Sequence, residues 1–214
     1  MRDYLGLIWV AMLAAGVCHA QTENPRMRVM ARDLGVACGY CHLAGTWRDD
    51  SKPQFAFTIR MTQMQDGLNG GTLRGFGGVT CWTCHRGKAI PARMPRASWQ
   101  DLLAKWPASL KLSEADARKP AEEVYRNIQS LKGSGAGGLA MTMSVFAGAL
   151  GVSCDYCHIE GEWESDARAA KRTARTMLGL FAEIPRYFES SRQPGMQCYT
   201  CHQGAAKPQR GPAN

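Results

Sequence analysis

The sequence predicts a mostly α-helical protein built from two repeated halves, and three observations support this. Eight of its nine Cys fall in four C-x-x-C-H segments, at residues 38–42, 81–85, 154–158 and 198–202. The segments recur at an almost constant offset of 116 residues. Leu, Ile, Val and Phe make up only 36 of the 214 residues, too few for an ordinary aliphatic core. The composition therefore excludes a membrane bundle, a collagen-like chain and an aliphatic-core enzyme.

The first twenty residues have the pattern of an export signal, so we predict a signal peptide over residues 1–20. An apolar run at 5–17 follows Arg2, is too short to cross a bilayer, and precedes the small residue Ala20. A buried helix or an uncleaved anchor is the alternative, and a lipid at Cys18 is a further one that Val17 disfavours. We expect a periplasmic or otherwise exported protein without a transmembrane span after signal removal.

C-x-x-C-H is the attachment signature of c-type haem. Two thiols three residues apart can bond the vinyl groups of one haem, while the adjacent His binds the iron as proximal ligand. A redox-active C-x-x-C, half a zinc site or a disulfide are alternatives for one copy, but four copies favour haem. We predict four covalently bound c-type haems that form the core. The attachment residues are Cys38, Cys41, Cys81, Cys84, Cys154, Cys157, Cys198 and Cys201, and the proximal ligands are His42, His85, His158 and His202.

The distal ligands must come from elsewhere, because the fifth His, His19, lies in the predicted signal. Met, Lys, the terminal amine, a partner's side chain and water are the alternatives. The repeat aligns residues 27–42 with 143–158, and pairs Met residues on stretches expected to be helical (138–150 and 167–181). Core packing is the other role open to these Met. The predicted distal ligands are Met27, Met61, Met143 and Met177, with Met30, Met64 and Met141 as alternatives.

The repeat also predicts the domain organisation. Half 1, with two haems, covers residues 21–90, and half 2, with two more, covers residues 121–204. A Pro-containing linker at 91–120 joins them, and residues 205–214 form a loose tail. The last motif of each half, at Cys81 and Cys198, is offset by 117 residues.

These segments, in this order, resemble the tetrahaem cytochrome c subunit of photosynthetic reaction centres over residues 27–204. The resemblance implies a mostly helical fold with a local two-fold axis, a chain of haems, and electron delivery to a photo-oxidised pigment pair. Two departures stand out. The family's fourth haem usually takes a distal His from the stretch equivalent to residues 66–79, which contains none here, and the first half has no counterpart to residues 121–132.

Met ligation favours ferrous iron and so predicts high reduction potentials. We expect an electron carrier, not an enzyme, that moves single electrons between periplasmic or membrane redox proteins. One alternative is a bound electron-donor subunit of a photosynthetic reaction centre. Others are a catalytic multihaem reductase with an open iron, and a structural protein whose chains stack into a conducting filament.

The formal charge of +8 is interpreted as compensation for the haem propionates. Nucleic-acid binding is disfavoured, since the basic residues are not clustered with aromatic residues in a known motif. Candidate propionate partners are Arg60, Arg86, Arg168, Arg172 and Arg175, which form a solvated face in the alternative interpretation.

Overall fold

The structure is a computed structural model that describes residues 24–49, 51–188 and 195–212. The predicted signal peptide and Cys18 lie outside these ranges. All regular elements of the described residues are helices, and strand-like pairing is limited to isolated bridges such as Leu43 with Thr46. The mostly α-helical prediction is therefore confirmed. Within the same ranges, no helix combines the length and the apolar character needed to cross a membrane.

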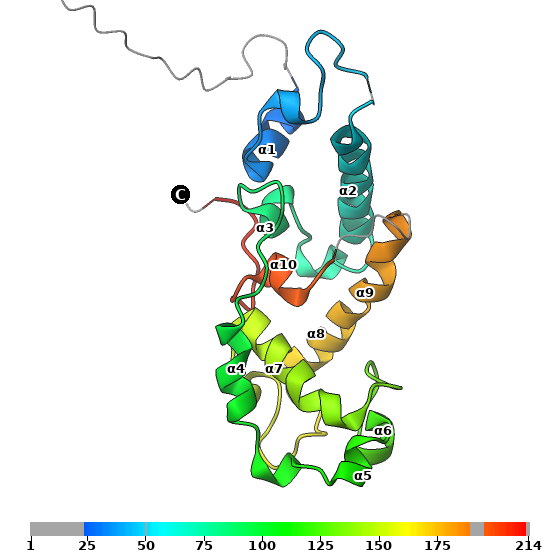
Figure 1. The fold of residues 1–214 in the computed structure, drawn as a ribbon, viewed down its shortest axis with the longest axis vertical. Coiled ribbons are helices and arrows are strands. Elements are labelled where there is room, and N and C mark those ends of the chain that lie inside the picture. The colour runs from blue at the N-terminus through cyan, green and yellow to red at the C-terminus, as the bar shows by residue number, and fades with distance from the viewer. Residues whose placement is uncertain (1–23, 50, 189–194, 213–214) are drawn as a thin grey trace, which may run out of the picture.

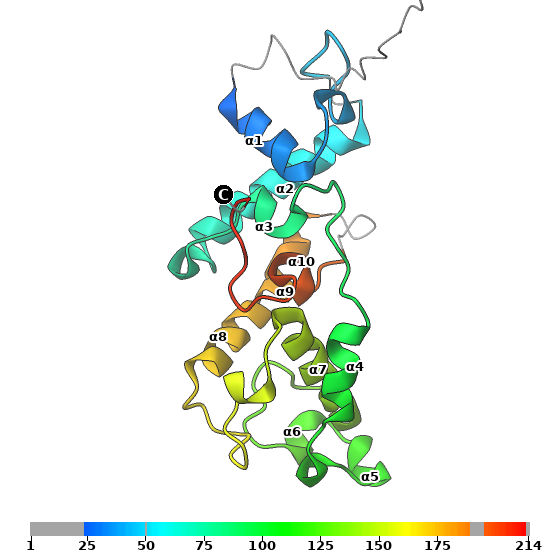
Figure 2. The same ribbon diagram turned by 90° about the vertical axis from the view of Figure 1, so that its left-hand side faces the viewer.

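The helices form an elongated molecule (Figures 1 and 2). One end contains α1 (Pro25–Leu34) and α2 (Pro53–Gly70), and the other contains α5 (Glu114–Ala117) and α6 (Ala121–Val124). Two short helices, α3 (Cys81–His85) and α10 (Cys198–His202), lie between them. The remaining helices are α4 (Ala97–Ala104), α7 (Leu139–Leu150), α8 (Ala169–Leu178) and α9 (Leu180–Glu183).

The helix that precedes the first C-x-x-C-H segment of each half ends in the same way. Gly35 after α1 and Gly151 after α7 both adopt a left-handed conformation with φ of 64°. Glycine is required there, because a Cβ would come under 3.0 Å from the carbonyl oxygen of Gly87 or Gly204 respectively. The amide N–H of Gly87 donates to the carbonyl of Asp33 on α1 at 2.8 Å, and the amide N–H of Gly204 donates to the carbonyl of Ala149 on α7 at 2.9 Å. These contacts hold α3 against α1 and α10 against α7.

The predicted linker contains α4, which packs along α7. The two helices approach so closely that a Cβ on Gly148 would lie under 3.0 Å from the backbone of Ser98. At the other end of the chain, residues 205–212 contact the first half, since the Thr80 hydroxyl donates to Arg210 O at 2.7 Å. The stretches expected to be a linker and a tail therefore make defined contacts.

The largest buried cluster joins the two halves. It consists of Met64, Leu68 and Leu73 from the α2 region together with Ile184 and Phe188 from the segment after α9. Elsewhere the buried apolar side chains are few, and large ones such as Tyr40, Tyr156 and Ile59 are 40–46% exposed. The polypeptide thus supplies only a small core of its own.

Candidate haem sites

The first and third C-x-x-C-H segments fold as matching 3₁₀ turns, at Cys38–Tyr40 and Cys154–Tyr156. In each, the amide of the His donates to the carbonyl of the first Cys at 3.0 Å. An isolated antiparallel β-bridge follows each turn and pairs Leu43 with Thr46 or Ile159 with Glu162. The 116-residue offset of the sequence therefore corresponds to the same local backbone.

The second and fourth segments form the helices α3 and α10 instead. A capping box starts each one: Thr83 N–H donates to the Thr80 hydroxyl oxygen at 3.3 Å, and Gln197 pairs with Thr200 in the same manner. The two caps fix the N-terminal ends of the helices, and the threonines at the third position are buried. Each Cys pair thus sits on one well-defined helical turn.

Three of the four motif histidines have an orientation that suits a metal ligand. Nδ1 of His85, His158 and His202 lies 2.9–3.0 Å from a backbone carbonyl, and because a carbonyl only accepts, that nitrogen carries the proton. Nε2 is then the atom with a free lone pair, which is the arrangement of a ligating imidazole with its outer partner in place. Burial lowers the pKa of His158 and His202, favouring the neutral form that binds iron. Nδ1 of His42 is buried and lacks a partner.

Seven of the eight motif thiols are free. Burial raises the pKa of Cys81, Cys157 and Cys198 and keeps them as thiols. The Cys84 and Cys201 thiols hydrogen-bond each other across the two halves, which raises the pKa of Cys84 and lowers that of Cys201.

A contact between α3 and α10 brings the second and fourth segments together (Figure 1). Arg86 Nη2 donates to His202 O at 3.3 Å, and Gln203 Nε2 donates to Cys84 O at 3.2 Å. Arg86 and Gln203 are equivalent positions, 117 residues apart, so the contact is nearly reciprocal. The first and third segments lie on opposite sides of it, one beside α1 and the other beyond α7 (Figure 2).

Asp33 is a buried residue that contacts the second haem-binding segment and that the motifs did not reveal. Its side chain is almost fully buried, accepts the Trp82 amide N–H at 3.1 Å, and pairs with Arg32 at 2.6 Å. The carboxylate therefore holds the first turn of α3 against α1. The equivalent residue in the second half is Ala149, so no repeat pattern could have identified this role.

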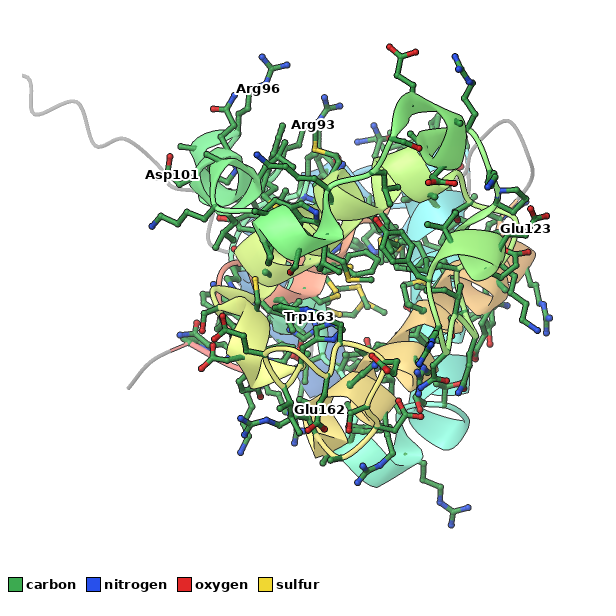
Figure 3. All side chains as sticks on the ribbon, turned by 90° about the horizontal axis from the view of Figure 1, so that it is seen from below. Arg93, Arg96, Asp101, Glu123, Glu162 and Trp163 are labelled. Carbon is green, nitrogen blue, oxygen red and sulfur yellow. The ribbon has the colours of Figure 1, made fainter. Side chains whose placement is uncertain are left out.

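The third segment is held by a charged network. The carbonyl of Trp163 accepts from both His158 Nδ1 and Lys171 Nζ, at 2.9 and 2.7 Å. Hydrogen bonds from Arg175 and Asn127 lower the pKa of Asp166 to about 2. Figure 3, a view along the long axis, shows Trp163 near the middle, whereas the charged side chains of Arg96 and Glu123 point outward.

The structure places the four predicted Met ligands in different environments. Met61 and Met177, one from each half, both pack against the buried cluster that contains Met64. Met27 on α1 is 38% exposed, and Met143 on α7 is half-buried. Among the alternatives, Met30 is half-buried and Met141 is 40% exposed. All four predicted residues lie on the helices that precede their motifs.

Comparison with known proteins identifies the family of the chain. The family model described as photosynthetic reaction centre cytochrome C subunit matches residues 27–103 and 96–211. The photosynthetic reaction center cytochrome c subunit of Rubrivivax gelatinosus is 28% identical over 217 residues, 81% of this chain and 59% of that subunit. The subunit of the same name from Thermochromatium tepidum is 35% identical over 101 residues, 45% of this chain and 25% of the subunit.

A third relative, cytochrome c-554 of Chloroflexus aurantiacus, is 30% identical over 115 residues, which cover 51% of this chain and 27% of that cytochrome. The chain spans about three fifths of the length of the Rubrivivax subunit. The family model nevertheless covers nearly all of the described residues. The chain belongs to the photosynthetic reaction centre cytochrome c subunit family, and its cofactor is covalently bound c-type haem.

Proposed function

We propose that the chain is a tetrahaem electron-transfer protein that acts as an electron-donor subunit of a photosynthetic reaction centre. The observation that carries the proposal is the α3–α10 contact, which joins the second and fourth haem-binding segments between the other two. Four sites in this order give a path along the whole elongated molecule. The role is that of an electron carrier, not of an enzyme.

In this proposal, each C-x-x-C-H segment holds one haem. The paired thiols would form the thioethers, and the motif His would supply Nε2 as the proximal ligand. In His85, His158 and His202 the backbone carbonyl at Nδ1 holds the imidazole in that tautomer. When bound, the haem iron supplies one-electron chemistry between its ferric and ferrous states. The exposed aromatic and aliphatic side chains beside the motifs, including Tyr40, Trp47 and Tyr156, provide apolar surface for the macrocycles.

The distal ligands are assigned to Met27, Met61, Met143 and Met177. The sequence repeat and the position of each Met on the helix before its motif support the assignment. Thioether sulfur stabilises ferrous iron, so these residues would set high potentials. Two haems in residues 21–90 and two in residues 121–204 make up the proposed halves, and residues 91–120 connect them.

Membership of the family supports the bound donor over a free periplasmic carrier. The similarity to cytochrome c-554 of Chloroflexus aurantiacus, whose name does not mention a reaction centre, keeps the free carrier as the second candidate. The two roles differ in how an electron reaches its acceptor, and this difference can be measured directly.

The test uses the haem-loaded protein and reaction centres that lack a bound cytochrome. After a laser flash, the rate of re-reduction of the photo-oxidised pigment pair is followed at increasing cytochrome concentration. The bound-donor proposal predicts a fast first-order phase whose amplitude saturates while its rate stays constant. A rate that rises linearly with concentration at physiological ionic strength would contradict a bound subunit and favour the free carrier.

A further inference from the structure

The α3–α10 contact is nearly symmetric in geometry but not in charge. Arg86 and Gln203 directly follow the motif histidines, both have φ of 46°, and each donates to a carbonyl of the opposite helix. One of the two side chains is a permanent cation and the other is neutral. The α3–α10 contact therefore carries one positive charge that the sequence repeat alone does not require.

The guanidinium of Arg86 has no acidic partner in the described part of the chain. Its Nε is buried without a hydrogen-bond acceptor, and its one hydrogen bond is to the uncharged His202 carbonyl. Asp33, the buried carboxylate that contacts α3, is already paired with Arg32. Arg86 is only partly buried, but a charge that is partly removed from water without an acidic partner is still costly, so its presence at this position needs an explanation.

The charge acts on both motifs. Arg86 directly follows His85, the last residue of α3, and its Nη2 donates to the carbonyl of His202, the last residue of α10, at 3.3 Å. The guanidinium therefore lies beside both haem-attachment helices.

We propose that Arg86 is a positioning residue that raises the reduction potentials of the haems at residues 81–85 and 198–202 together. The ferric state carries one more positive charge than the ferrous state, so a nearby, partly buried cation disfavours oxidation. A guanidinium also matches a carboxylate in shape, so a propionate of either haem is a suitable counter-ion. The inference rests on the proposed function in that it requires haems at both motifs.

The consequence is that one side chain sets the two central sites as a pair. An electron that reaches the α3–α10 contact is then shared between two haems whose reduction potentials both depend on the Arg86 charge. The first and third sites, on either side of the contact, are left to be set by their own surroundings.

The test is a spectroelectrochemical titration of the haem-loaded Arg86→Gln variant, which copies the residue found at position 203. We expect two of the four haems to titrate lower, with the ferric-to-ferrous ratio at fixed potential rising about threefold or more, roughly 30 mV for a one-electron couple. Arg86→Lys keeps the charge and should leave the potentials close to those of the unmodified protein. Arg118→Gln, which removes a 76% exposed charge directly after α5, is the control and should shift none.

The double variant Arg86→Gln with Gln203→Arg returns the charge to the equivalent position of the other half. The proposal predicts that the two lowered potentials move back up. Unchanged potentials in Arg86→Gln, an equal shift of all four haems, or a double variant that stays low would each overturn it. If Arg86→Gln fails to retain four haems, the double variant alone tests the proposal. Potentials close to those of the unmodified protein support it, and lowered potentials overturn it. Fewer than four haems in the unmodified protein would instead contradict the proposed function.

Discussion

Asp166 shows how a single residue stabilises a haem-binding segment from outside it. Its carboxylate lies 2.8 Å from Arg175 on α8 and accepts from Asn127 Nδ2 at 2.9 Å. Asn127 also donates to Glu164 O at 2.6 Å. The residue therefore ties the loop after the third motif to both α8 and the segment that only the second half possesses.

The pKa of Asp166 gives this contact a defined pH dependence. Because the folded-state pKa is about 2, below the ordinary value of 3.8, the carboxylate contributes stability that is present above pH 4 and lost as the pH falls towards 2. Asp166→Asn should therefore lower the urea midpoint of the haem-loaded protein at pH 6, with the difference closing near pH 2. Asp101→Asn, on the exposed face of α4, controls for charge. A difference that stays constant across this pH range would contradict the argument.

At the scale of elements, the sequence predicted structure that depends on neighbouring residues, such as helix formation, but not contacts between distant segments. The helical character of residues 138–150 was predicted, and the structure has a helix over Leu139–Leu150 that is followed by Gly151. The position of α4 could not be predicted, because the composition of residues 91–120 says nothing about which distant helix they contact. The pairing of α3 with α10 was missed for the same reason, since it joins motifs 117 residues apart.

The packing of α4 on α7 can be tested at Gly148. In a helix interior, Gly to Ala normally stabilises by about 1 kcal/mol. Here the added methyl would meet the backbone of Ser98, so Gly148→Ala should instead destabilise the haem-loaded protein, by about 1–3 kcal/mol for an overpacked contact. Thermal unfolding measures the change. Gly138→Ala, where nothing lies within 4 Å of the added atom, is the matched control. Equal melting temperatures for the two variants would argue against close packing.

At the scale of the whole molecule, the amount of aliphatic core is the deciding feature. The buried cluster around Met64 joins the halves but leaves large apolar side chains near the motifs partly exposed. The sequence predicted this from its low Leu, Ile, Val and Phe content, and the haems are expected to complete the core. The distal ligands could not be fixed in the same way, because neighbouring Met residues such as Met61 and Met64 share a helix and differ only in rotation.

The central claim is that four haems with His and Met ligands act as one high-potential chain. A spectroelectrochemical titration of the purified mature protein, with haem content measured on the same sample, tests it most directly. The account predicts four haems per chain, all titrating at clearly positive potentials. Fewer than four haems, or a haem that titrates far below the others, would contradict it at the site concerned.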